Sequence, residues 1–70
     1  MNRKAARDEA YRWARSMVLG QSAAQLRERR EDVTEEVGEI MHDTGAGLDT
    51  AFEAMYTAID DRISELEERE

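Results

Sequence analysis

Residues 43–47 read Asp-Thr-Gly-Ala-Gly and separate two long segments whose apolar residues recur at helical spacing. The segment before this stretch, residues 23–43, carries one apolar stripe interrupted by an arginine, and residues 48–69 carry a second stripe. A short connection between two helices makes them antiparallel neighbours. The sequence therefore predicts an all-α fold built on an antiparallel helical hairpin.

The two stripes also predict which residues of the hairpin face each other. In an antiparallel pair, residues early in one helix lie against residues late in the other. Centring the turn between Thr44 and Gly45, where the glycines place it independently, gives five predicted layers. They are Ala23 with Leu66, Leu26 with Ile63, Arg30 with Ile59, Val33 with Tyr56, and Val37 with Phe52.

Residues that favour helix ends divide the chain further. Gly20 suits the left-handed position after a helix, and Ser22 with Gln25 has the spacing of a capping box. Thr50 with Glu53 repeats that spacing at the start of the last segment. We predict a break after Gly20; the alternative is one helix that continues through it, since an interior glycine costs only ~1 kcal/mol.

The formal charges are strongly polarised along the chain. Residues 1–30 contain eight Lys and Arg against three Asp and Glu, a net charge of +5. Residues 31–70 contain two against fourteen, a net charge of −12, so the whole chain carries −7. An uneven layout of this kind indicates that the two parts attract each other.

A basic helix predicted over residues 3–19 would lie on the hairpin and complete a three-helix bundle. If this helix runs antiparallel to the helix over residues 23–43, Arg7 lies level with Glu35 and Arg3 lies level with Glu39. Carboxylates four residues apart on one helix repel one another, so the basic helix is expected to neutralise them.

Arg30 is the one charged residue of the predicted hairpin contact. The antiparallel arrangement of the helix over residues 3–19 brings Arg30 near Trp13, where its guanidinium could lie on the indole ring. The alternative is that Arg30 extends past the apolar stripe to the surface. The sequence leaves both open.

Length and composition indicate the class of protein. Seventy residues suffice for one domain, residues 1–70, with a marginal core, because such a chain buries only ~60% of its unfolded surface. Lacking cysteine, it forms neither disulfides nor thiolate metal sites. We expect no secretory signal, because no apolar run follows the first residues, and no run of ~18 apolar residues for a membrane span is present. We expect a cytoplasmic protein, of a microbe or of a virus acting in its host's cytoplasm.

No motif predicts catalysis, a cofactor or a metal. Asp43-Thr-Gly-Ala46 copies an aspartic-protease signature, but that chemistry needs a second aspartate and a β-scaffold. Glu39 and His42 have the spacing of a di-iron helix, yet both flank the apolar stripe and are expected to face water. Residues 43–49 lack the acidic ligands of a calcium loop. We expect no enzyme activity, no cofactor and no metal site.

The arginines of the N-terminal half raise the question of nucleic-acid binding. Residues 27–30, with Arg12 and Arg15, form a basic stretch. However, the sequence pI of about 4.6 is opposite to that of most binders. A nucleic-acid-binding regulator is therefore the least favoured function, and internal salt bridges are the preferred explanation of these arginines.

The acidic surface carries the predicted function. Carboxylates one turn apart (~5.4 Å) on rigid helices can bind and cover the basic surface of a partner protein. The candidate residues are Asp32, Glu35, Glu36, Glu39, Asp43, Asp60 and Asp61. Alternatively, the rows imitate nucleic-acid phosphates and inhibit a nucleic-acid-binding protein or enzyme; the composition is similar to that of small acidic helical inhibitors, including viral anti-defence proteins. A charged face that is only solvated is the commoner explanation of such rows.

Self-association is the other part of the expected function. One small core does not cover all the apolar residues of the first and last helices, and dimerisation into a larger bundle would. The candidate residues are Tyr11, Trp13, Met17, Met55, Tyr56, Ile59, Ile63 and Leu66. We therefore expect a homo-oligomer.

Overall fold

The computed structural model describes residues 3–68, which form four α-helices and no strand. The helices are α1 (Arg3–Val18), α2 (Ala23–Arg30), α3 (Thr34–Thr44) and α4 (Leu48–Glu68). The all-α prediction is confirmed, but the prediction of three helices is wrong, because the expected helix over residues 23–43 is divided into α2 and α3. Arg69, the predicted last residue of the final helix, lies outside the described residues.

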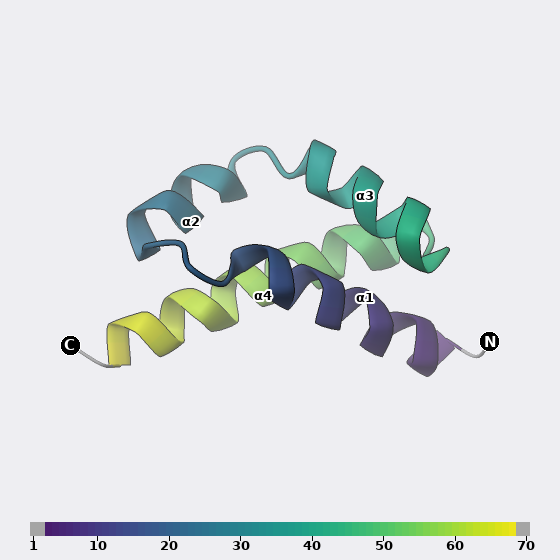
Figure 1. Ribbon diagram of the computed structural model, residues 1–70, viewed down its shortest axis with the longest axis horizontal. Coiled ribbons are helices and arrows are strands. Elements are labelled where there is room, and N and C mark those ends of the chain that lie inside the picture. The colour runs from purple at the N-terminus through teal and green to yellow at the C-terminus, as the bar shows by residue number, and fades with distance from the viewer. Residues whose placement is uncertain (1–2, 69–70) are drawn as a thin grey trace.

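The helices form a small elongated bundle of 39 × 21 × 16 Å (Figure 1). α2 and α3 follow each other along one side, while α1 and α4 cross on the other (Figure 1). The order of the ion pairs gives the helix directions. Arg27 pairs with Glu67 and Arg30 pairs with Asp60, so α2 and α4 are antiparallel. α1 packs most extensively against α4 and runs in the same direction as that helix.

The break between α2 and α3 is a tight turn closed by backbone and side-chain bonds. The N–H groups of Glu31 and Asp32 donate to the carbonyls of Glu28 (3.2 Å) and Arg29 (3.0 Å), which are only three residues back. The Asp32 carboxylate then accepts the N–H of Thr34, the first residue of α3, at 3.1 Å. An aspartate that bonds the backbone two residues on favours a turn over a continuing helix.

The other helix ends agree with the sequence at two of three places. Gly20 has φ of +84°, and the capping box of Ser22 and Gln25 is formed by bonds of 3.1 and 2.9 Å, as predicted. Gly45 ends α3 at φ of +74°. The predicted cap at Thr50 is wrong, because α4 begins two residues earlier and Thr50 lies within its first turn.

The core is narrow and rich in alanine. Among the described residues, no charged or polar residue is buried. The largest fully buried side chains are Val18, Leu26, Val33, Val37, Ile40, Met55 and Ile59. Both α1 and α4 bury alanines, which lets these two helices approach closely; they are Ala10, Ala14, Ala51, Ala54 and Ala58.

Candidate protein-interaction surface

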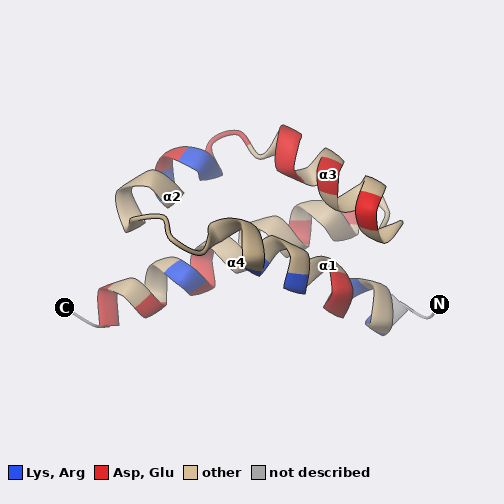
Figure 2. Ribbon diagram, viewed as in Figure 1, with Lys and Arg blue, Asp and Glu red and all other residues tan. Residues whose placement is uncertain are grey.

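The outer side of α3 carries a line of three carboxylates, Glu35, Glu39 and Asp43, called here the α3 acidic row. All three are exposed and follow one another at intervals of four residues, and the acidic positions of α3 are red in Figure 2. Within residues 3–68 none of them forms an ion pair. Each adjacent pair repels by a few tenths of a kcal/mol. The row is therefore a source of negative charge that the fold leaves uncompensated.

Two further predicted carboxylates on this side have partners within the chain. The side chain of Glu36 is only 13% exposed and lies 3.3 Å from Nη1 of Arg29. Asp32 accepts the N–H of Thr34, and this backbone hydrogen bond lowers the pKa of Asp32. These two acids therefore have structural contacts as well as charge.

A polar hollow opens beside them, between α2 and α3. Its volume is about 470 Å³, and it exists because the chain turns sharply between these helices. Its lining residues are Gln21, Gln25, Glu28, Arg29, Asp32, Glu35 and Glu36. Four carboxylates against one guanidinium make this a negatively charged recess that extends the α3 acidic row toward α2.

Asp60 on α4 is compensated by Arg30. The guanidinium donates to the carboxylate from Nε at 2.9 Å and lies 4.9 Å from the centre of the Tyr56 ring. The hydrogen bond to Asp60 raises the pKa of Arg30. The predicted contact of Arg30 with Trp13 is wrong, and Arg30 instead reaches the surface, the alternative that the sequence left open. Arg30 thus lies between Tyr56 and Asp60, residues on either side of its predicted partner Ile59.

Among the described residues, the one ion pair between α1 and another helix goes to α4 and not to α3. Arg15 donates two hydrogen bonds from Nη2 to the Glu65 carboxylate, at 2.8 and 3.0 Å. The Tyr11 hydroxyl donates to Asp61 at 2.6 Å, which raises the pKa of Tyr11. The expected pairing of Arg7 with Glu35 is wrong, because the described residues contain no such ion pair. The side chain of Arg3, expected opposite Glu39, lies outside the described part of the chain.

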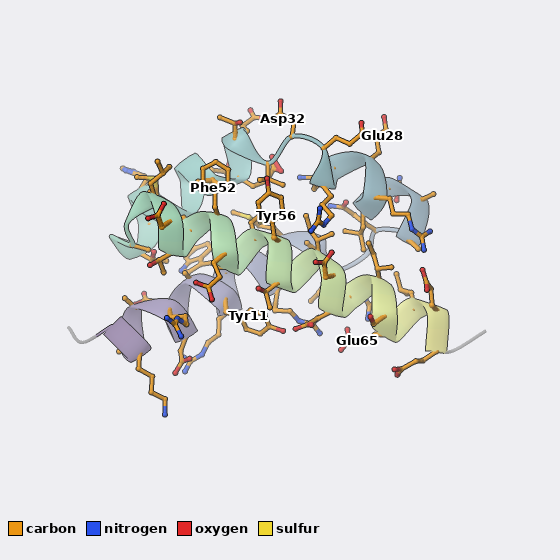
Figure 3. The ribbon with its side chains drawn as sticks, turned by 180° about the vertical axis from the view of Figure 1, so that it is seen from behind. Tyr11, Glu28, Asp32, Phe52, Tyr56 and Glu65 are labelled. Atoms are coloured by element: carbon orange, nitrogen blue, oxygen red, sulfur yellow. The ribbon has the colours of Figure 1, made fainter. Side chains whose placement is uncertain are left out.

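A signal for this arrangement was present in the sequence. Tyr11 and Arg15 are one helical turn apart, as are Asp61 and Glu65. Two parallel helices bring such pairs together in the same order. Figure 3 shows Tyr11 and Glu65 on one side of α4, with Phe52 and Tyr56 on the other side, toward α2 and α3.

The apolar candidates for self-association differ in their exposure. Met55 and Ile59 are fully buried within the single chain. The side chain of Trp13 is exposed, at 40%. The others are partly buried and pack against the core; they are Tyr11, Met17, Tyr56, Ile63 and Leu66.

The structure shows neither a metal site nor a membrane span in the part of the chain it describes. No three His, Cys, Asp or Glu residues among positions 3–68 are placed to hold a metal ion. Glu39 and His42 are both exposed on α3, with His42 in its last turn. None of the helices combines the length and apolar character needed to cross a membrane.

Comparison with known proteins assigns no family. No protein-family model matches the chain, and no curated protein or solved structure is significantly similar to it. Any function must therefore be inferred from the surface of the chain itself.

Proposed function

We propose that this chain is a small acidic protein–protein interaction module that binds a basic surface of a partner protein and covers it. The observation that carries the proposal is the uncompensated α3 acidic row. Three acids of α4 have partners, since Tyr11 meets Asp61, Arg15 meets Glu65 and Arg30 meets Asp60, whereas Glu35 and Glu39 meet no cation of the described chain. A partner that supplies cations would relieve repulsion that the folded chain retains.

Rigidity supports binding at this surface. The row lies on a helix whose opposite side is fixed by the buried residues Val37 and Ile40. Carboxylates held in a fixed line lose little conformational freedom on meeting a matching line of cations. Their field also raises the association rate with a basic partner, and salt weakens that effect.

Imitation of a nucleic acid remains the alternative proposal, and charge density disfavours it. The eight helical steps from Glu35 to Asp43 advance the α3 acidic row by ~12 Å. Duplex DNA carries about seven charges over that length, whereas the row offers three. Asp60 and Asp61, which would have extended the acidic surface, already meet Arg30 and Tyr11.

Direct nucleic-acid binding by the N-terminal half is the weakest proposal. Four arginines of that half are directed toward carboxylates of the same chain and would have to leave them to reach phosphates. The pairs are Arg15–Glu65, Arg27–Glu67, Arg29–Glu36 and Arg30–Asp60.

We also propose that the chain self-associates, that its hairpin has the five layers predicted from the sequence, and that it is located in the cytoplasm. An oligomer would present several acidic rows on one particle and raise the effective affinity for a repetitive basic partner. The chain then acts by occupying a surface and not by catalysis.

The test uses a helical peptide that carries arginines four residues apart, the spacing of the α3 acidic row. The triple variant Glu35→Gln, Glu39→Gln, Asp43→Asn should weaken peptide binding about tenfold, because three exposed ion pairs contribute ~0.5 kcal/mol each. Fluorescence anisotropy across a salt series measures this, with the expected loss largest at low salt.

The matched control removes the same charge elsewhere. Asp49, Glu53 and Glu68 are exposed and form no ion pair with other described residues. The variant Asp49→Asn, Glu53→Gln, Glu68→Gln should bind the peptide nearly as well as the unaltered chain. Equal losses in the two variants, or none in the first, would show that the α3 acidic row is not the binding surface.

A further inference from the structure

The side of α1 that faces away from the core carries a second helical stripe. Its residues, called here the α1 outer stripe, are separated by four, three, four and three residues, so they share one face of the helix. They are Ala5, Glu9, Arg12, Ser16 and Leu19. Leu19, just after the end of α1, is 56% exposed, and Trp13 borders the stripe with 40% exposure.

Arg12, Ser16 and Leu19 of this stripe are exposed. Arg12, Trp13 and Ser16 line a shallow depression of about 250 Å³ on the surface. The small Ser16 side chain leaves room beside the indole ring for another large group. Tryptophan and arginine are the side chains most enriched at the energetic centres of protein interfaces.

The charges of the stripe are complementary to those of a second copy that runs in the opposite direction. Glu9 and Arg12 form no ion pair with any described residue and lie about one turn apart. When a second copy of the helix runs in the opposite direction, Glu9 of each copy comes within reach of Arg12 of the other. Two reciprocal ion pairs then form around one two-fold axis, the commonest symmetry of soluble oligomers.

We propose that the α1 outer stripe is a dimerisation surface that binds the same stripe of a second copy, antiparallel, with the two-fold axis between Glu9 and Arg12. Trp13 of each copy then borders the contact, where its ring becomes less exposed to water. At the ends of the contact, the small Ala5 of each copy faces Ser16 of the other. This inference rests on the self-association in the proposed function and is independent of the α3 acidic row.

One helix pair is a small contact, so the dimer is expected to be weak. Specific interfaces usually take ~800 Å² from each partner, about a sixth of the 4800 Å² surface of this chain, and a single helix face offers less. The association should therefore appear in the micromolar range and depend on concentration. It leaves α3 uncovered, so one dimer would present two acidic rows.

The decisive experiment mixes two variants that should each be unable to dimerise. Glu9→Arg places two arginines in the stripe, and Arg12→Glu places two glutamates there, so each variant repels itself. A mixed dimer restores both ion pairs with the charges exchanged. Sedimentation equilibrium should show each variant with dimerisation weakened about tenfold or more, and the equimolar mixture restored to nearly the affinity of the unaltered chain.

Trp13 provides a second readout, because it is the only tryptophan of the chain. Its emission should shift to shorter wavelength with rising concentration in the unaltered chain and in the mixture, but not in either variant alone. Trp13→Ala should weaken dimerisation while circular dichroism shows an unchanged helix content.

The outcomes separate this inference from the proposed function. Dimers of the unaltered chain that neither charge variant weakens, or a mixture that is not restored, would overturn this contact and leave self-association through another surface. A chain that stays monomeric into the hundreds of micromolar would overturn both the contact and self-association. Binding of the arginine peptide tests the α3 acidic row separately in either case.

Discussion

Glu65 joins α1 to α4 through its contacts with two arginines. Its carboxylate accepts both hydrogen bonds from Arg15 and lies 3.6 Å from Arg62. The hydrogen bond from Arg15, followed by the smaller effect of Arg62, lowers the pKa of Glu65. A carboxyl group with a lowered pKa stabilises the fold at pH values above its unfolded pKa, and this stabilisation disappears as the pH falls through the folded value.

Replacing Glu65 by Gln should therefore destabilise the chain in a pH-dependent way. At neutral pH we expect the melting temperature to fall by a few degrees, because the charge-assisted bonds to Arg15 are lost. Below about pH 4, where the unfolded carboxyl group becomes protonated, the difference should begin to shrink, and the two chains should melt alike only once the pH lies below the lowered pKa of the folded Glu65. Thermal unfolding followed by circular dichroism at several pH values measures this, with Glu68→Gln as the control. A difference that stays constant into acid would contradict the role of the charge.

At the scale of one helix, the glycine inside α3 and the glycine directly after it should respond in opposite ways to the same substitution. Gly38 lies inside the helix, and a Cβ added there meets no atom within 4 Å, whereas Gly45 has φ of +74°. Gly38→Ala should raise the free energy of unfolding by ~1 kcal/mol, since alanine favours the helix. Gly45→Ala should lower it by about 1–2 kcal/mol, since an L side chain is strained there. Urea unfolding compares them, and destabilisation by Gly38→Ala would contradict an open helix surface.

The same element shows why the break before α3 was not predicted. Apolar spacing predicts helices well where they pack, and here it kept one helical register through Leu26, Val33 and Val37, with Arg30 as its one charged position. The break depends on Asp32 bonding the backbone of Thr34, and an aspartate in an acidic run gives no periodic signal of that bond. Gly20 was recognised because its left-handed conformation excludes most other residues.

The candidate surface was predictable in its acids but not in their partners. The sequence identified the exposed carboxylates of α3, but it assigned the cations of α1 to them. The actual assignment depends on how α1 crosses α4, and that crossing is set by buried alanines such as Ala14 and Ala58, which apolar spacing alone does not rank above larger residues. Which charges remain uncompensated is therefore decided by the core.

The whole molecule depends on this close approach of α1 and α4. Ala58 is fully buried on α4, so Ala58→Leu adds volume where the helices are close, and overpacking of this kind costs about 1–3 kcal/mol. A core in a chain of 70 residues supplies only ~3–5 kcal/mol in total, so the loss should be a large part of the stability. Ala24→Leu on the exposed side of α2 is the matched control and should change the free energy of unfolding little. Urea unfolding decides between them. If the two variants unfold alike, α1 can move away from α4 at low cost, and the pairing of Arg15 with Glu65 would then hold α1 in place more than the alanine core does.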